Sequence, residues 1–261
     1  MTISFEKYHG AGNDFILLDN RTGQYNELTT ANIAALCHRR FGIGADGLMM
    51  LNTHPDYDFA MRYFNSDGKE STLCGNGGRC ITAFAKHLNL IQVDAHFIAI
   101  DGPHQATVFP NGDIRLAMND VQQVETHETY MALNTGSPQY VCFTDDANDI
   151  DVPAEGRLIR NSPKYRDEGI NVNFVSEINH NELYVRTYER GVEDETWSCG
   201  TGVTAAAIAF AINSQGPQSI RVQTKGGLLN VSFHANAQQF THVFLTGPAQ
   251  WVFSGQIEMP L

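Results

Sequence analysis

The chain contains the stretch Leu73-Cys74-Gly75-Asn76-Gly77-Gly78 and, later, a second stretch of the same kind, Ser198-Cys199-Gly200-Thr201-Gly202. The two cysteines are 125 residues apart (199 − 74), close to half of the 261 residues. Each precedes small residues that lead into an apolar segment with helical spacing. The repeat predicts two related halves, each with a cysteine at the start of a helix.

Two other features repeat with nearly the same spacing. Arg62 and Arg186 lie in strand-like segments 124 residues apart (186 − 62), and Gly102 and Gly226 are also 124 apart (226 − 102). Three features in register within one residue indicate a duplication, although chance similarity between strand and helix segments is the alternative.

The hydrophobic pattern predicts helices at 29–37, from Cys74 to about 89 and from Cys199 to about 212, and strands at 16–18, 59–64, 97–100, 106–109, 114–118 and 183–188. Residues 203–212 are apolar nearly all round, so this helix must be buried on most sides, as when a sheet wraps it. We therefore expect an α+β fold of two pseudo-symmetric halves, each a β-sheet wrapped around a central helix.

A polar, turn-like segment at 119–129 predicts the boundary between the halves. The N-terminal half, 1–118, then carries Cys74, and the C-terminal half, 119–261, carries Cys199. This division leaves open whether the last strand returns to the N-terminal half.

The amino-acid composition of the chain excludes several classes of protein. Hydrophobic residues make up 42% of the chain and charged residues 18%, which is ordinary for a protein with a core. The net charge of −12 argues against nucleic acid or an anionic membrane as the main partner. Residues 1–20 lack the apolar middle of an export signal, and no apolar run is long enough to span a membrane. Five cysteines, an odd and low number, fit a cytoplasmic protein better than a disulfide framework.

The two cysteine loops combine features that suit proton transfer at carbon. A helix start presents unpaired backbone N–H groups and a partial positive charge, which stabilise a thiolate and can hold a carboxylate. If the halves face each other, one thiolate can remove a proton from one face of a carbon while one thiol delivers a proton to the other face. The pattern predicts an amino-acid racemase or epimerase with Cys74 and Cys199 as acid and base.

The other three cysteines have a simpler interpretation. Cys37, Cys80 and Cys142 lie in apolar segments, where cysteine usually serves as a small buried side chain. No Cys-x-x-Cys or Cys/His spacing typical of a metal site is present in the sequence, so we expect no metal.

Several motifs together resemble the diaminopimelate epimerase family over essentially the whole chain. They are Lys7-Tyr-His-Gly-Ala-Gly-Asn-Asp-Phe15, Phe64-Asn-Ser-Asp-Gly68, Cys74-Gly-Asn-Gly77, Asn171-Val-Asn-Phe174, and Tyr188-Glu-Arg-Gly191 followed by Cys199-Gly-Thr-Gly202. The resemblance implies interconversion of LL- and meso-diaminopimelate in lysine and cell-wall precursor synthesis, without a cofactor. It also implies two pseudo-symmetric domains with the active site between them, and it suggests a homodimer.

The resemblance assigns roles to particular residues. Cys74 and Cys199 correspond to the acid/base pair. The backbone at Gly75, Asn76, Gly200 and Thr201 corresponds to the cradle for the carboxylate at the reacting centre. Polar side chains that recognise the substrate correspond to Asn13, Asn65, Asn171, Glu189 and Arg190. Glu189 suits the distal ammonium and Arg190 the distal carboxylate, whereas outside this motif the two would indicate a surface ion pair.

Two departures from the family pattern affect the second half. Where the family usually has Gly-Asn-Pro-His, this chain has Gly136-Ser137-Pro138-Gln139. Ser137 can still hydrogen-bond, but Gln139 cannot titrate. The loop that begins at Gly191 is also one residue longer than the commoner form, which affects how Glu195 and Thr196 reach the site.

Three other functions compete with this interpretation. A related cysteine-pair racemase of the proline or hydroxyproline type is disfavoured by the Tyr-Glu-Arg-Gly and Asn-Asp-Phe segments. A nucleotide-binding protein is disfavoured because the glycine loops lack the Gly-x-Gly-x-x-Gly and P-loop patterns. A non-catalytic module that binds a small molecule would have no need for paired thiols.

Overall fold

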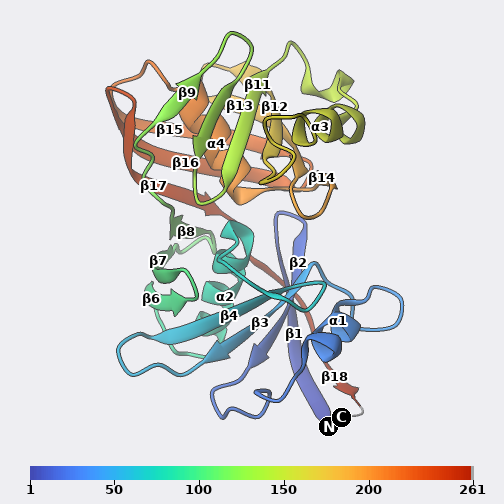
Figure 1. Cartoon of the computed structure of the whole chain (residues 1–261). Coiled ribbons are helices and arrows are strands. Elements are labelled where there is room, and N and C mark those ends of the chain that lie inside the picture. The colour runs from blue at the N-terminus through green and yellow to red at the C-terminus, as the bar shows by residue number, and fades with distance from the viewer. Residues whose placement is uncertain (260–261) are drawn as a thin grey trace. The chain divides into compact units, whose positions relative to one another are not determined.

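The computed structural model describes residues 1–259 and divides the chain into two compact units. Unit 1 combines Met1–Leu116 with the segment that begins at Pro248, and unit 2 is Ala117–Gly247. The last strand therefore belongs to the first unit, where it pairs with the first strand of the chain (Figure 1).

The strands of unit 1 pair in the order β18–β1–β2–β3–β4–β6–β7–β8, with β5 added against β4. The pairs β2–β3 and β4–β6 are parallel and the others antiparallel. The bounds are β1 Thr2–Gly10, β2 Asn13–Asp19, β3 Gly47–Asn52, β4 Phe59–Asn65, β5 Glu70–Ser71, β6 Asp94–Ala99, β7 Gly102–Val108, β8 Ile114–Ala117 and β18 Gln250–Glu258.

The strands of unit 2 pair in the order β9–β10–β11–β12–β13–β15–β16–β17, with β14 added against β13. Here the parallel pairs are β11–β12 and β13–β15. The bounds are β9 Val124–Thr126, β10 Met131–Asn134, β11 Pro138–Phe143, β12 Asn171–Asn179, β13 Glu182–Glu189, β14 Asp194–Thr196, β15 Gly216–Thr224, β16 Gly227–Asn236 and β17 Gln239–Gly247.

The two units repeat one topology. In each, the third and fourth strands of the order and the fifth and sixth are parallel, and a short extra strand joins the fifth. The helices take equivalent places, with α1 (Thr30–Cys37) and α3 (Val152–Arg160) before the fourth strand, and α2 (Gly75–His87) and α4 (Gly200–Phe210) before the sixth. The duplication inferred from sequence spacing is thus present in the pairing of the strands.

The central helix of each unit is buried. Within α4, Gly200 and all residues from Gly202 to Ala209 are buried, and the helix packs against strands β10 to β13 and β15 to β17. Most of α2 is buried as well, and it contacts β1, β2, β3 and β7. An all-apolar helix such as α4 is stable only when a sheet covers it on most sides. This confirms the α+β fold with a wrapped helix in each half.

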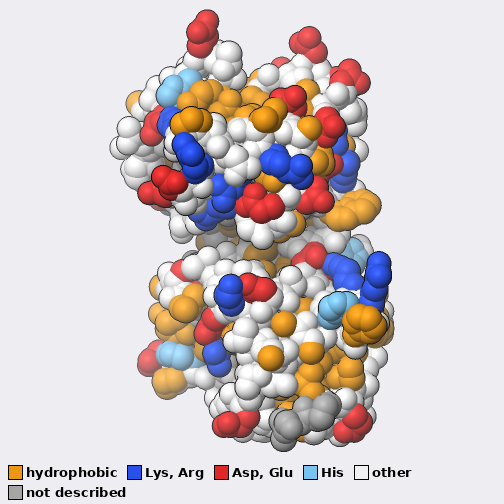
Figure 2. Space-filling model, turned by 45° about the vertical axis from the view of Figure 1, so that its right-hand side comes forward, with side chains coloured by type: hydrophobic (Ala, Val, Ile, Leu, Met, Phe, Trp, Pro, Cys, Tyr) orange, Lys and Arg blue, Asp and Glu red, His pale blue; other side chains and the backbone are white. Residues whose placement is uncertain are grey.

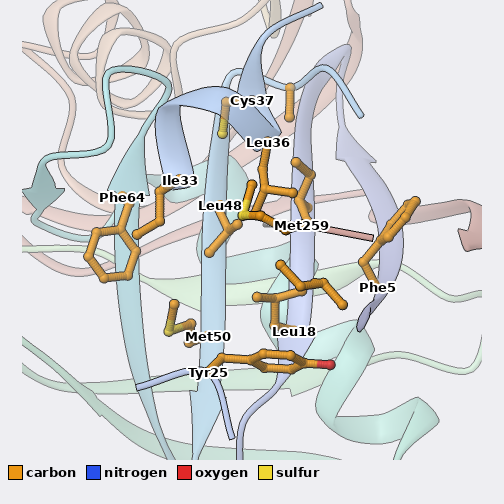
Figure 3. Packing of buried hydrophobic residues seen from close by; sticks show 13 residues of the cluster. Phe5, Leu18, Tyr25, Ile33, Leu36, Cys37, Leu48, Met50, Phe64 and Met259 are labelled. Carbon is orange, nitrogen blue, oxygen red and sulfur yellow. The ribbon is translucent and has the colours of Figure 1, made fainter. Parts of the chain in front are cut away.

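The smaller helices cover the outside of the sheets. Thr29 caps α1 through a capping box with Asn32, and Ile33, Leu36 and Cys37 of the helix pack in the core cluster of unit 1 with Leu48 (Figure 3). In unit 2, Asp151 caps α3, which the sequence pattern did not predict. A single turn of 3-10 helix, η1 (Ala147–Asp149), precedes α3.

The surface carries charged side chains of both signs (Figure 2). On the face shown in Figure 2, Asp and Glu side chains are interspersed with Lys and Arg. In residues 1–259 we find no helix with the length and apolar character needed to cross a membrane.

Helix α3 approaches its sheet at a glycine, and this contact gives a stability prediction. A Cβ added to Gly156 would overlap the side chain of Tyr188, which is fully buried in β13. We expect Gly156→Ala to cost about 1–2 kcal/mol, because overpacking outweighs the gain in helix propensity. The apparent midpoint of thermal unfolding should fall by several degrees. Leu158→Ala, on the exposed side of the same helix, should change it little, and an unchanged midpoint for Gly156→Ala would show that the helix can move away.

Candidate active site

Each cysteine of the repeat is the N-cap residue of a central helix. Cys74 precedes α2 and Cys199 precedes α4, and both have extended backbone angles. The first turn closes on the cysteine carbonyl in both, through Gly78 N–H at 2.7 Å and Val203 N–H at 2.9 Å. Neither helix has an acidic residue in its first turn, so the positive end of each helix is not neutralised by its own side chains.

The glycine three residues after each cysteine is required by packing. A Cβ at Gly77 would overlap the Met49 side chain, and a Cβ at Gly202 would overlap the side-chain oxygen of Asn173. Both helix starts therefore lie close against neighbouring strands of their own units. The Cys-Gly-x-Gly pattern is explained by this close approach.

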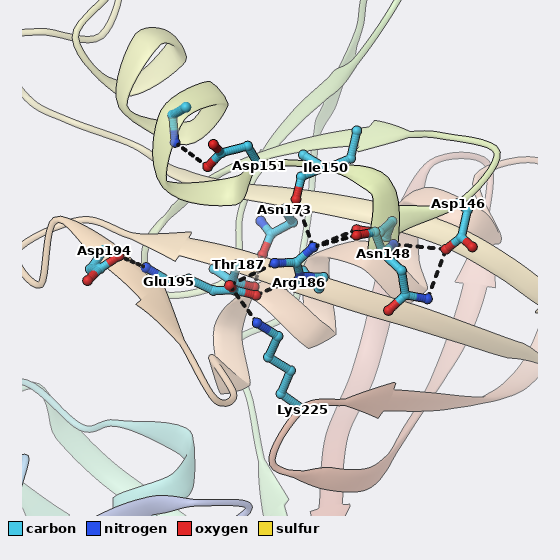
Figure 4. Close-up of polar contacts among 12 residues, drawn as sticks. Asp146, Asn148, Ile150, Asp151, Asn173, Arg186, Thr187, Asp194, Glu195 and Lys225 are labelled. Atoms are coloured by element: carbon cyan, nitrogen blue, oxygen red, sulfur yellow. Dashed lines mark hydrogen bonds and ion pairs between the residues drawn. The ribbon is translucent and has the colours of Figure 1, made fainter.

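An ion pair holds the hairpin that leads to each cysteine. Arg62 on β4 forms a bidentate pair with Glu70 on β5, with Nε–Oε1 at 2.8 Å. The equivalent pair in unit 2 joins Arg186 on β13 to Glu195 on β14 at 2.7 Å (Figure 4). The repeat of Arg62 and Arg186 in the sequence thus marks a structural device, although the spacing alone did not reveal its partners.

Burial by itself would raise the pKa of Glu195, but hydrogen bonds from Arg186 and from Lys225 outweigh it and lower the pKa. Glu195 is consequently a charged anchor of the loop. Its carboxylate pairs with Arg186 and with Lys225, each at 2.7 Å, and is therefore not available as a proton donor or acceptor.

In unit 1 the structure brings Cys74, Asn13 and Asn76 together. Asn13 Oδ1 lies 3.5 Å from Cys74 Sγ and accepts a hydrogen bond from Asn76 Nδ2 at 3.3 Å. Asn76 is held in turn by the fully buried Arg79, whose Nη2 donates to Asn76 Oδ1 at 2.8 Å. Sequence reasoning missed Arg79, because nothing in a helical pattern distinguishes a buried arginine from an exposed one.

A network of charged side chains holds the side chain of Asn13 in place. Asn13 Nδ2 donates to Asp46 Oδ2 at 2.7 Å, and Arg39 bridges Asp46 and Asp14 with contacts of 2.6 and 2.7 Å. Lys7 pairs with Asp14 at 2.7 Å. Burial alone would raise the pKa of Asp14, but the hydrogen bonds from Arg39 and Lys7 reverse this and lower the pKa to about 2.

In unit 2 a chain of polar side chains reaches Cys199. Thr201 Oγ1 lies 3.4 Å from Cys199 Sγ, and Gln139 Nε2 donates to the same hydroxyl at 3.0 Å. Gln139 is fully buried and accepts from Asn173 Nδ2 at 3.0 Å. The residue that replaces the family's histidine therefore contacts the site through Thr201. Asn173, which lies in the recognised motif, has a role that the sequence did not assign.

A second polar group in unit 2 gathers around Asn171. Its Oδ1 accepts from the backbone N–H of Arg190 at 2.8 Å, and its Nδ2 donates to Ser137 Oγ at 3.0 Å. The Arg190 guanidinium donates to the Glu168 carbonyl at 2.8 Å and reaches Ser137 Oγ at 3.5 Å. Within residues 1–259 no Asp or Glu side chain forms an ion pair with Arg190, so Arg190 and its neighbour do not form the surface ion pair of the alternative interpretation.

The remaining two candidate residues are Glu189 and Asn65. Glu189 accepts from Thr196 Oγ1 at 2.9 Å, which ties it to the loop before Cys199. Asn65 ends β4 with an exposed side chain, and in the described part of the chain no hydrogen bond joins it to Asn13 or Cys74. Asn65 therefore stays a prediction from the motif.

The other three cysteines are kept neutral by burial. Desolvation raises the pKa of Cys37 to about 12 and that of Cys142 to about 11, and it raises the pKa of the fully buried Cys80 even further. In residues 1–259 no group of three or more His, Cys, Asp or Glu side chains is arranged to hold a metal ion.

Comparison of sequences relates the chain to one family. The family model described as diaminopimelate epimerase matches residues 5–129 and 131–252. A diaminopimelate epimerase of Flavobacterium psychrophilum is 51% identical over 252 residues, covering 96% of this chain and 98% of that protein. The enzyme of Chlorobaculum tepidum is 39% identical over 260 residues, covering 96% and 99%.

Comparison of folds finds similar architectures in more distant proteins. A PhzF-family phenazine biosynthesis protein of Bacillus anthracis superposes with a TM-score of 0.77 at 14% identity, covering 99% of this chain and 100% of that one. A probable proline racemase of Agrobacterium radiobacter gives a TM-score of 0.72 at 14% identity, covering 99% and 93%. At this identity the likeness concerns the fold alone.

The network behind Asn13 gives a pH-dependent prediction. Because the folded-state pKa of Asp14 is about 2, below the ordinary value near 4, its contribution to stability is present above about pH 4 and is lost as pH falls through about 2. Arg39→Ala should therefore lower stability at pH 7, by no more than about 1 kcal/mol, because the Arg39 side chain is 58% exposed.

Urea unfolding at pH 7, 5 and 3 measures this effect, with the exposed neighbour Arg40→Ala as control. The difference between Arg39→Ala and the wild type should shrink toward pH 3. A difference that is as large at pH 3 as at pH 7 would contradict the assignment of the low pKa to this network.

Proposed function

Because the chain belongs to the diaminopimelate epimerase family, we propose that it interconverts LL-2,6-diaminopimelate and meso-diaminopimelate by inverting one carbon without a cofactor. The reaction serves lysine and cell-wall precursor biosynthesis. The observation that carries the proposal is the repeated helix start, with a cysteine as N-cap and Gly-x-Gly behind it, at the same place in both units.

The chemistry requires two groups of opposite protonation. One cysteine, as thiolate, takes the proton from the α-carbon, and the other, as thiol, gives its proton to the opposite face of the same carbon. A single base would tend to return the proton to the face that it left. Cys74 and Cys199 are the pair that the proposal assigns to these roles, and the three remaining cysteines are too buried and too weakly acidic for them.

The negative charge that develops on the substrate carboxylate needs stabilisation. The first-turn N–H groups at Gly75 and Asn76 in α2, and at Gly200 and Thr201 in α4, lie at helix ends that carry no acidic side chain. Such ends bind carboxylates, and their partial charge opposes the charge of the carbanion. This arrangement supports proton removal without pyridoxal phosphate or a metal.

The distal end of the substrate carries both an ammonium and a carboxylate. We assign the carboxylate to Arg190, whose guanidinium is positioned by Glu168 and Ser137 and has no carboxylate partner in residues 1–259. We assign the ammonium to Glu189. Asn171, Asn13 and Asn65 complete the proposed recognition of the substrate, and Asn171 also fixes the backbone of Arg190.

We further propose that the protein acts in the cytoplasm as a homodimer, with diaminopimelate as its small-molecule partner. The low cysteine content and the family resemblance support these two expectations. Sedimentation of the purified protein decides the oligomeric state.

The two-base mechanism predicts the behaviour of cysteine variants. Cys74→Ala and Cys199→Ala should each lose essentially all conversion of LL- to meso-diaminopimelate. Inversion needs a proton acceptor on one face of the α-carbon and a proton donor on the other. Cys142→Ala should keep the activity, since its thiol lies outside the proposed site. Chiral chromatography of the products after incubation is the measurement. If either site variant kept a substantial share of wild-type turnover, the two-base assignment would be wrong.

Selectivity for the distal group rests on Arg190. Arg190→Ala should lower kcat/KM at least roughly thirtyfold, because the distal carboxylate then loses its charged partner. This factor corresponds to a loss of about 2 kcal/mol of transition-state stabilisation. Arg157→Ala on the exposed side of α3 serves as control. Alanine and lysine should be poor substrates of the wild type. Efficient racemisation of alanine would instead indicate a different substrate class.

A further inference from the structure

The turn that carries Glu189 and Arg190 contains a glutamate in an uncommon backbone conformation. Glu193 has a φ of 59°, in the left-handed region that residues with a β-carbon rarely adopt. Its backbone N–H donates to the carbonyl of Glu189 at 2.8 Å and closes the turn between β13 and β14. Glycine adopts this conformation without strain, whereas a glutamate persists here only because surrounding contacts hold it.

The carboxylate of Glu193 accepts hydrogen bonds from three donors in unit 2. Oε1 accepts from the backbone N–H of Gly191 and from Arg160 Nε, each at 3.1 Å, and Oε2 accepts from the hydroxyl of the fully buried Tyr188 at 3.3 Å. Burial alone would raise the pKa of Glu193, but the hydrogen bonds from Gly191 and Arg160 outweigh it and lower the pKa. The side chain is therefore a charged acceptor that joins the turn to the end of α3.

Arg160 also holds the segment that contacts the Arg190 side chain. Its Nη1 donates to the carbonyl of Arg166 at 2.9 Å. This segment leads to Glu168, whose carbonyl accepts from the Arg190 guanidinium at 2.8 Å. It ends at Gly169, where an added Cβ would lie 2.6 Å from Arg190 Cδ, so the stem of the arginine packs closely here. One ion pair thereby links the turn that bears the arginine to the segment that places its guanidinium.

We propose that Glu193 is a positioning residue that fixes the turn bearing Glu189 and Arg190 and so sets the selectivity for the distal end of the substrate. Arg190 can pair with a distal carboxylate only while the turn and the segment 165–169 are both held in place. This inference rests on the proposed function for the identity of the distal group, whereas the link between the two segments does not depend on it.

The competing explanation is that Glu193 only supports the hairpin that leads to Cys199, as the pair of Arg186 and Glu195 does. Loss of the Glu193 carboxylate would then impair proton transfer for every amino acid alike. Under the proposal, the loss concerns only substrates whose distal carboxylate pairs with Arg190.

Steady-state kinetics of Glu193→Gly separate the two explanations, because this variant removes the carboxylate and also relieves the backbone strain. For LL-diaminopimelate, kcat/KM should fall roughly three- to tenfold, mainly through KM, which is the scale of one lost hydrogen bond. Exchange of the α-hydrogen of lysine in deuterium oxide should keep its wild-type rate, because lysine has no distal carboxylate. A parallel loss with both compounds would overturn the proposal.

A double-mutant cycle with Arg190→Ala gives a second kinetic readout. In the Arg190→Ala background, Glu193→Gly should lower kcat/KM for LL-diaminopimelate by less than about twofold, because its effect passes through the missing guanidinium. The same fold-loss in both backgrounds would show that Glu193 acts elsewhere and would contradict the proposal.

Two further variants serve as controls. Asp194→Asn changes the charge of the same turn by the same amount, and Asp194 Oδ1 accepts from the backbone N–H of Glu195 at 2.8 Å (Figure 4). Within residues 1–259 no hydrogen bond joins the Asp194 side chain to Gly191 or Arg160, so this variant should keep the wild-type kcat/KM. Glu193→Gln keeps an acceptor for the turn but loses the charge, and its kcat/KM should lie between those of the wild type and Glu193→Gly.

Hydrogen exchange in the full-length, substrate-free protein tests the link without a substrate. In Glu193→Gly the amides of residues 188–194 and 165–170 should exchange at least about threefold faster, whereas those of α4 should keep their wild-type rates. Wild-type exchange in the segment 165–170 would overturn the proposal, because the ion pair would then not hold it. A wild type without activity toward diaminopimelate would refute the proposed function alone, since the exchange rates still decide the link.

Discussion

A helix that is buried inside a sheet must begin inside the protein, where the N–H groups of its first turn find no water. In α2 and α4 a cysteine occupies the N-cap, and no side chain caps the helix. The small residues that follow allow the first turn to lie close against neighbouring strands, as the packing of Gly77 and Gly202 shows. In the proposed function these helix ends stabilise a sulfur and an anion. The topology of each unit and the chemistry that we propose both depend on this helix start.

The two units repeat the backbone of this arrangement but not its polar surroundings. The side-chain oxygen of Asn13 lies 3.5 Å from Cys74 Sγ, and the hydroxyl of Thr201 lies 3.4 Å from Cys199 Sγ. Duplication thus supplies two equivalent positions with different polar neighbours. Gln139 fits this arrangement without needing to titrate, because its amide has a donor end and an acceptor end, and both are used.

The sequence predicted what depends on local pattern: the wrapped apolar helix α4, the cysteines at helix starts and the duplicated order of strands. It did not predict α3, whose short pattern carries Pro153 and Gly156, or the partners of Arg62 and Arg186. Asp46, Arg79 and Asn173 were missed for the same physical reason. Their roles arise from contacts between segments distant along the chain, and a buried polar residue in a strand or helix leaves no periodic signature. Asn65 was chosen from a motif, and within residues 1–259 no hydrogen bond links its side chain to Asn13 or Cys74.

Inversion of LL-diaminopimelate by the purified protein in deuterium oxide tests the central claim most directly. If two cysteines exchange their protons with solvent and serve opposite faces, the meso product formed early in the reaction carries one deuterium at the inverted carbon, while the remaining LL substrate is unlabelled. Mass spectrometry and proton NMR of both isomers give the answer. Meso product that retains the original hydrogen, or label that enters the LL substrate as fast as the product, would show that one group moves the proton and would contradict the account.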